Sequence, residues 1–160
     1  MSFRILPCDK AVHGDARKTF SSGSEPLDAY FRVQLSRDLK SRVSVCFVAL
    51  DAESLVGYYT LSAASVILGA LPPRVAAKLP KYPHVPVIRL GRLAVDQKCQ
   101  GKGFGGVLVA DAMARAEVAP IGAFALLVDA KDEHAKNFHL HLGFTPLADA
   151  PFQLFHPLGP

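Results

Sequence analysis

Residues Arg89–Gly106 read RLGRLAVDQKCQGKGFGG, and the remaining elements are most easily placed by starting from this stretch. Apolar and β-branched residues between Val85 and Val95 predict a buried strand, and a polar link begins at Asp96. From Val107 onward, apolar residues recur at helical spacing. A strand, a loop and a helix N-terminus in this order direct backbone N–H groups and the helix dipole at one point. The loop is therefore predicted to bind a phosphate or pyrophosphate, through a run that contains Gly101, Gly103, Gly105 and Gly106.

Three known phosphate-binding loops can be compared with this run of glycines. The P-loop closes with Gly-Lys-Ser/Thr, whereas residues 105–107 (GGV) offer neither the lysine nor a hydroxyl for Mg²⁺. The dinucleotide fingerprint G-x-G-x-x-G needs an acidic residue about 20 positions later. Asp129 lies in that range but ends a strand of its own, so the match is poor. The pattern Q/R-x-x-G-x-G/A is met by Gln100, Gly103 and Gly105, and an ordinary glycine-rich turn remains the alternative.

The third pattern resembles the acyl-CoA pyrophosphate loop of the GNAT family of N-acetyltransferases. Three further stretches resemble the toxin acetyltransferases of type II toxin–antitoxin modules, namely residues 20–31 (FSSGSEPLDAYF), 56–62 (VGYYTLS) and 86–96 (PVIRLGRLAVD). The resemblance extends from about Phe20 to Leu158. It implies one α/β domain over residues 1–160 with the GNAT fold. In that fold helices flank a central mixed β-sheet, and splayed central strands hold acetyl-CoA.

The spacing of apolar residues, taken alone, indicates a mixed α/β domain. Strands are predicted at residues 3–7, 43–50, 55–63, 85–95, 123–129 and 152–158. Helices are predicted at residues 24–39, 104–117 and 131–142, with a short helix within 65–80 and the start of another at 15–18. The second and third strands should form a hairpin. The fifth should run parallel to the fourth, because a helix connects them.

The composition fits a single domain with an anionic partner. Half of the 160 residues are apolar, no run approaches the roughly 18 apolar residues of a membrane span, and the N-terminus lacks the apolar stretch of a signal peptide. A cytoplasmic protein is therefore expected. Cys8, Cys46 and Cys99 show neither paired spacing nor C-x-x-C, so no disulfide framework or zinc site is predicted. The net charge of +4 suits CoA phosphates or a nucleic acid.

The resemblance also implies how acetyl-CoA, the co-substrate, would be held without a metal. Backbone groups of the central strand would pair with the pantetheine arm, and the glycine loop would take the pyrophosphate. Asn137 and Phe138 would contact the cofactor from a later motif. The remaining residues of this implied site are Leu93, Ala94 and Val95 on the strand, and Gln100, Gly101, Lys102, Gly103, Phe104, Gly105 and Gly106 in the loop.

His139 is the catalytic candidate and the main departure from the family. In the family motif A-x-x-F-Y-x-x-x-G-F the tyrosine donates a proton to the CoA sulfur, and residues 135–144 (AKNFHLHLGF) place His139 there. Imidazole titrates at about pH 6.5, which suits proton transfer, although its ring is shorter than that of tyrosine. Three hypotheses stay open: His139 is the general acid, the enzyme works by positioning alone, or the change disables it. A metal site with His134 and His141 is disfavoured, because His139 does not share their helix face.

Basic residues are candidates for contacting the phosphates of an RNA acceptor. Arg89 and Arg92 flank the start of the GRLAVD sequence, and an ion pair at the strand edge is the alternative for either. Arg42 and Lys81 complete the candidate set. Further basic residues, for each of which an ordinary solvated surface position is favoured, are Arg32, Arg37, Lys40, Arg74 and Lys78.

The resemblance implies an acetyl-CoA-dependent N-acetyltransferase that is the toxin of a type II toxin–antitoxin system. Such an enzyme acetylates the α-amine of aminoacyl-tRNA and so blocks translation. The implied partners are a ribbon-helix-helix antitoxin and, in a homodimer, a second copy of the chain, with no membrane. Two alternatives stay open. One is a GNAT enzyme acting on a small amine or a protein N-terminus, and the other is a catalytically idle member that binds only CoA or the antitoxin.

Overall fold

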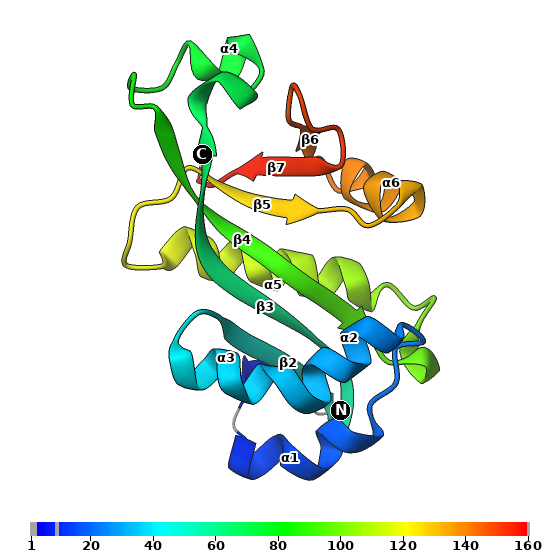
Figure 1. Ribbon diagram of the computed structural model, residues 1–160. Coiled ribbons are helices and arrows are strands. Elements are labelled where there is room, and N and C mark those ends of the chain that lie inside the picture. The colour runs from blue at the N-terminus through cyan, green and yellow to red at the C-terminus, as the bar shows by residue number, and fades with distance from the viewer. Residues whose placement is uncertain (1–2, 9, 160) are drawn as a thin grey trace. The chain divides into compact units, whose positions relative to one another are not determined.

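The structure, a computed structural model, describes residues 3–8 and 10–159, with only the backbone described at residues 10–13 (Figure 1). The strands are β1 (Phe3–Pro7), β2 (Val45–Asp51), β3 (Ser54–Ile67), β4 (His84–Val95), β5 (Ala125–Asp129), β6 (Thr145–Pro146) and β7 (Gln153–Pro157). The α-helices are α1 (Lys10–Thr19), α2 (Glu25–Ala29), α3 (Leu35–Ser41), α4 (Pro73–Ala76), α5 (Phe104–Val118) and α6 (Glu133–His141). A π-helix, η1 (Tyr30–Gln34), joins α2 to α3, and two 3₁₀ turns are η2 (Leu68–Ala70) and η3 (Gln97–Cys99).

The strands form one mixed sheet in the order β1-β2-β3-β4-β5-β7-β6. Strands β2 and β3 form the predicted antiparallel hairpin, and β5 pairs with β4 in the predicted parallel sense. Strand β7 is antiparallel to both β5 and β6. The expected fold class, a mixed sheet with flanking helices, is therefore confirmed.

The chain divides into two compact units. Unit 1 comprises the residues up to Ser62 together with Gly91–Ala112, and unit 2 comprises Ala63–Leu90 and the residues from Met113. The elements β3, β4 and α5 each contribute residues to both units. That the whole chain acts as one domain stays a prediction.

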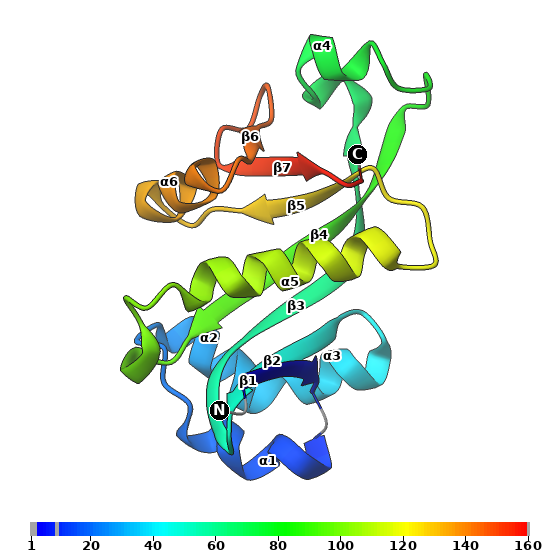
Figure 2. The same ribbon diagram turned by 180° about the vertical axis from the view of Figure 1, so that it is seen from behind.

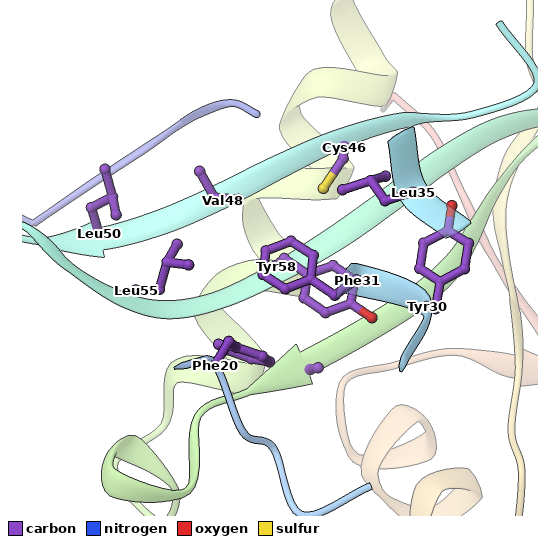
Figure 3. Close-up of a cluster of buried hydrophobic side chains, with 10 residues drawn as sticks. Phe20, Tyr30, Phe31, Leu35, Cys46, Val48, Leu50, Leu55 and Tyr58 are labelled. Atoms are coloured by element: carbon purple, nitrogen blue, oxygen red, sulfur yellow. The ribbon is translucent and has the colours of Figure 1, made fainter. Parts of the chain in front are cut away.

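Aromatic rings form the centre of the core of unit 1 (Figure 3). The rings of Phe31 and Tyr58 stack with centroids 4.2 Å apart, and Phe20 meets both of them edge-on. Successive strand residues point to opposite faces of a sheet, and β3 shows this at adjacent tyrosines. The Tyr58 hydroxyl donates to Leu27 O of α2 at 2.7 Å, whereas the Tyr59 hydroxyl donates to Asp111 Oδ2 of α5 at 2.6 Å. Strand β3 is thereby attached to a helix on each face (Figure 2).

Unit 2 has a core of its own. It is formed by apolar residues of the distal half of β3, the first half of β4, β5 and β7, including Val66, Val87, Leu127 and Phe155. Helix α6 begins as expected, because the Asp132 carboxylate accepts a hydrogen bond from Ala135 N at 2.8 Å. Gly143 follows the helix with a φ of +94°, a conformation that favours glycine.

Three elements differ most from their predicted limits. Helix α1 spans ten residues where the polar sequence suggested only a short start, because Arg17 is buried and donates to Phe31 O at 2.9 Å and to Ser36 Oγ at 3.1 Å. The helix predicted at residues 24–39 is interrupted by the π-helix η1. Strand β3 continues to Ile67, well past the predicted end. Across the described residues, no helix is long and apolar enough to cross a membrane.

Candidate functional site

The glycine loop of unit 1 has the geometry that its sequence predicts. Asp96 follows the last residue of β4 and caps the turn η3, where its carboxylate accepts a hydrogen bond from Lys98 N at 3.0 Å. Gly101 and Gly103 follow with φ of +77° and +85°, values that other residues adopt only with strain. Helix α5 then begins at Phe104, and the first backbone N–H groups of an α-helix have no acceptor within the helix. The arrangement presents several N–H donors at the positive end of a 15-residue helix.

The space beside the loop is open. A Cβ added to Gly101 or Gly103 would meet no heavy atom within 4 Å among the residues that the structure describes. Lys102, between them, is exposed. A bulky anion could therefore approach the backbone at these positions, which is the test that a pyrophosphate site must meet.

The side chain of Gln100 faces the protein. Its Nε2 donates to Ser22 O at 2.7 Å and to Val95 O at 2.9 Å. Gln100 was predicted to belong to the cofactor-binding loop, and in the structure its side-chain amide also joins two parts of the protein. Any cofactor contact from this residue would then come from its backbone.

The end of β4 is closely packed against β3. An added Cβ at Gly57 would lie 2.5 Å from Ala94 O, so only glycine fits where the two strands approach. The register of β4 with β5 runs from Val87 to Leu90 in unit 2, whereas β4 itself continues to Val95. Within unit 1, Leu93 and Val95 are half-buried and Ala94 is buried. Their backbone role toward a pantetheine arm stays a prediction.

Arg92 has a defined orientation in unit 1. Its guanidinium lies 3.6 Å from the centre of the Tyr30 ring, which is a cation–π contact. The Tyr30 hydroxyl donates to Asp38 Oδ2 at 2.7 Å, and Gln34 Nε2 donates to Asp38 Oδ1 at 3.0 Å. The hydrogen bond from Gln34, followed by that from Tyr30, holds the pKa of the Asp38 carboxyl below its usual value. No hydrogen-bond acceptor for the Arg92 guanidinium is found among residues 3–8 and 10–159, so its N–H edge is available to an anion.

The other residues predicted to contact an RNA acceptor are divided between the two units. In unit 2, Arg89 pairs with Asp129 at 2.8 Å, which is the ion pair that the sequence left as its alternative. Lys81, also in unit 2, donates to Ala76 O at 3.0 Å at the end of α4. Arg42, in unit 1, is exposed directly after α3 and is left-handed, with a φ of +61°. The binding roles of these residues stay predictions.

His139 is buried in unit 2, with 7% of its surface exposed. The rings of Phe138 and Phe144 lie 5.1 and 5.4 Å away, and Asn137 is exposed beside them. Burial lowers the pKa of the His139 imidazole below its usual value. Its Nδ1 is buried without a hydrogen-bond partner in the described part of the chain. The same part of the chain contains no cluster of three His, Cys, Asp or Glu residues that could hold a metal.

Three residues of the stretch at residues 20–31 have partners in the structure that the sequence did not predict. Ser22 and Asp28 belong to the stretch at residues 20–31, and their side chains are hydrogen-bonded to one another at 2.7 Å. Tyr30 of the same stretch lies under Arg92. The spacing of residues in that stretch indicated that it matters, but the spacing does not predict which residues its side chains contact.

Comparisons with known proteins agree with these observations. The family model for the acetyltransferase (GNAT) family matches residues 11–144. The chain is 39% identical over 138 residues, 85% of this chain and 82% of the other, to a tRNA-acetylating toxin of Mycobacterium tuberculosis. A solved structure of AtaT complexed with acetyl-methionyl-tRNAfMet has a TM-score of 0.89 and 31% identity, covering 98% of this chain and 95% of that one. A tyrosine-to-phenylalanine mutant of the AtaT toxin, bound to the C-terminus of the antitoxin AtaR and to acetyl-CoA, has a TM-score of 0.78 and 28% identity, covering 98% and 94%.

Proposed function

The chain belongs to the acetyltransferase (GNAT) family, and we propose that it is a toxin that transfers an acetyl group from acetyl-CoA to the α-amine of aminoacyl-tRNA. The observation that carries this proposal is the sequence identity of 39% to a tRNA-acetylating toxin over 85% of the chain. The blocked aminoacyl group could no longer accept a peptide, so translation would stop.

The glycine loop is the proposed site of the CoA pyrophosphate. When bound, acetyl-CoA supplies the acetyl thioester. The chain contributes backbone N–H groups at residues 101–106, the dipole of α5 and the charge of Lys102. The positive φ values at Gly101 and Gly103 and the open space beside them support this assignment.

The acceptor is proposed to be RNA because unit 1 carries unused cations. Arg37, Lys40 and Arg42 lie on or directly after α3, are exposed, and form no hydrogen bond or ion pair through their side chains within the described part of the chain. Arg92 adds an oriented guanidinium. Arg32 is a weaker candidate, since it pairs with Glu25 at 2.9 Å. Phosphate contacts of this kind make binding strongly salt-dependent.

His139 is proposed to act as a neutral hydrogen-bond donor. A protonated ring would place a charged N–H at Nδ1, where the described residues offer no acceptor, and this costs more than burying the bare nitrogen. The favoured form is then the neutral ring with its hydrogen on Nε2. This form supports the hypothesis that the enzyme works chiefly by positioning the reactants, with His139 a weak donor where the resemblance expects tyrosine.

A catalytically idle protein is the second candidate. The observation that favours it is the histidine at the position where the family motif has its tyrosine. An idle member would still bind CoA and an antitoxin, because the glycine loop does not depend on His139.

The proposed partners follow from the same relatives. AtaT has been solved with the C-terminus of its antitoxin AtaR, and we expect this chain to be neutralised by an antitoxin as well. The ribbon-helix-helix type of that antitoxin, the homodimer and the single-domain behaviour of the chain are parts of this proposal.

The deciding experiment is acetyl transfer in vitro. Purified protein is mixed with labelled acetyl-CoA and with total charged tRNA, uncharged tRNA or free amino acids, and the products are identified by mass analysis. Acetylated aminoacyl-tRNA is expected only in the first mixture. The Gly103→Val variant should lose the reaction and CoA binding together. Equal rates on free amino acids would support a small-amine acetyltransferase, and CoA binding without any transfer would support the idle protein.

A further inference from the structure

Two segments far apart in the sequence are joined by hydrogen bonds in unit 1. Backbone Ser21 N donates to Asp96 Oδ2 at 3.2 Å, and Gln97 N donates to Ser21 O at 2.8 Å. Asp96 N in turn donates to Val56 O of β3 at 2.7 Å. The start of the turn η3, which leads into the glycine loop, is thus hydrogen-bonded to Ser21 and to Val56 of β3.

A second connection runs through side chains. The Gln100 amide donates to Ser22 O and to Val95 O, so it spans from the end of β4 to the N-terminal segment. Ser22 is itself held by Asp28 of α2. The Ser22 N lies 3.0 and 3.1 Å from the two carboxylate oxygens, and the Ser22 hydroxyl donates to Oδ1 at 2.7 Å. Ser22 therefore links the other two residues: its carbonyl oxygen accepts from Gln100, and its N–H and hydroxyl donate to Asp28, which gives the hydrogen-bonded chain Gln100–Ser22–Asp28.

Burial distinguishes the two ends of this chain. Asp28 is 4% exposed, so its carboxylate needs the hydrogen bonds that Ser22 provides. Gln100 is exposed, and it immediately precedes Gly101. The exposed end of the chain is therefore the one that adjoins the glycine loop, and the buried end is anchored in the core of unit 1.

We propose that Ser22, Asp28 and the side chain of Gln100 are positioning residues that hold the glycine loop in its anion-binding geometry. The inference rests on the proposed function in that it takes CoA as the ligand of this loop. None of the three side chains touches the cofactor in this proposal. Glycines give a loop many conformations, and ordering it on binding costs conformational entropy. A loop that is already ordered binds more tightly for that reason.

The test uses two variants and a matched control. Gln100→Met keeps the length of the side chain without its donors, and Asp28→Asn is isosteric but loses the negative charge. Gln97→Ala is the control, because it removes an exposed side chain of the same turn, whose bond to the Ser21 hydroxyl is 3.3 Å, and keeps the Gln97 backbone donor. Calorimetry gives the Kd of CoA, steady-state kinetics give KM and kcat, and hydrogen exchange of residues 101–106 is measured without cofactor.

Each of the two variants should raise the Kd of CoA and the KM for acetyl-CoA by about tenfold, the size expected for one lost hydrogen bond to a charged or preorganised group. The kcat at saturating acetyl-CoA should stay within about twofold, since the reacting atoms are not contacted. Amide exchange in the loop should accelerate in both variants and not in Gln97→Ala. The double variant should bind CoA about as tightly as the single variant with the lower affinity, because both substitutions interrupt the same hydrogen-bonded chain.

Several outcomes would overturn the inference. Folded variants with unchanged amide exchange in the loop and unchanged CoA affinity would do so. So would a double variant in which the increases in the Kd of CoA from the two substitutions multiply. If Asp28→Asn does not fold, Ser22→Ala takes its place, since it removes the two hydrogen bonds of the hydroxyl, to Asp28 Oδ1 and from Ser24 N, and keeps the Ser22 backbone bonds. A wild-type protein that binds no CoA would contradict the proposed function, while the exchange measurement would still test whether the chain Gln100–Ser22–Asp28 orders the loop.

Discussion

The guanidinium of Arg92 lies 3.6 Å above the Tyr30 ring, while Arg89, three residues earlier on β4, pairs with Asp129 at 2.8 Å. Successive strand residues point to opposite faces, so two arginines three residues apart on one strand have different surroundings. The Arg92 guanidinium keeps an N–H edge that is available to an anion, whereas the Arg89 guanidinium is paired with a carboxylate.

Arg92→Gln should therefore weaken the binding of the acceptor, charged tRNA. We expect the KM for charged tRNA to rise about tenfold, consistent with one lost hydrogen bond to a charged group. The slope of log affinity against log salt should fall by about 1, as for one lost phosphate contact. Binding of charged tRNA at several salt concentrations measures both quantities.

Arg89→Gln is the matched control. Loss of the Arg89–Asp129 ion pair should lower the free energy of unfolding by at most about 1 kcal/mol, the usual size for a partly exposed ion pair. The salt slope should stay at the wild-type value. A slope that drops for Arg89→Gln and not for Arg92→Gln would reverse the assignment of the two residues.

Gly57 provides a test of the packing between β3 and β4. A Cβ at this position would lie 2.5 Å from Ala94 O and 3.0 Å from Leu108 Cδ1, so Gly57→Ala forces a shift of the backbone. We expect a loss of about 1–3 kcal/mol in the free energy of unfolding, the usual cost of overpacking. Gly69→Ala is the control, because an added Cβ there meets no described atom within 4 Å, and its effect should stay within about 0.5 kcal/mol. Urea denaturation compares the two, and equal effects would argue against the close approach of the strands.

Much of this site could be predicted from the sequence, because it is local. The strand, the glycine loop and the helix are consecutive, and each has its own signal in spacing and in glycine content. The same holds for the cap of α6 at Asp132. The hairpin followed from its short turn, and the parallel pair followed from the helix that connects its two strands.

The partners of individual side chains could not be predicted, because they come from distant parts of the chain. Gln100 donates to Ser22 O, 78 residues earlier, and Tyr59 donates to Asp111, 52 residues later. The π-helix η1 places Tyr30 and Phe31 in the core, and no local sequence pattern distinguishes it from an ordinary α-helix. For the same reason the sequence could not choose between a phosphate contact and an ion pair for Arg89.

The burial of His139 should make stability depend on pH. The pKa of the imidazole is lower in the folded protein than in the unfolded chain, where it is about 6.5. The stabilisation is therefore fully present above about pH 6.5 and is lost as the pH falls through the folded pKa. His139→Gln has no ionisation here, so its free energy of unfolding should decline less than that of the wild type below pH 6.5. Parallel declines in the two proteins would show that His139 titrates normally.

The rate of acetyl transfer should reveal which form of His139 works. A charged imidazolium acid predicts that the rate falls as the pH rises past the imidazole pKa, whereas a neutral Nε2–H donor predicts a rise through the same range. The acceptor amine complicates a direct reading, because α-amines ionise at about pH 7.7–8.0.

His139→Tyr removes this difficulty, because its rate carries the ionisation of the amine without that of an imidazole. The ratio of the wild-type rate to the His139→Tyr rate in single turnovers should then rise with pH below about 6.5 and level off, since burial lowers the pKa of His139. His139→Ala should cost less than about tenfold if positioning dominates, against the 10²–10⁴-fold typical of a lost general acid. A ratio that falls with rising pH, together with a large alanine effect, would establish the imidazolium as the acid. Activity in His139→Tyr alone would identify the histidine as a disabling change.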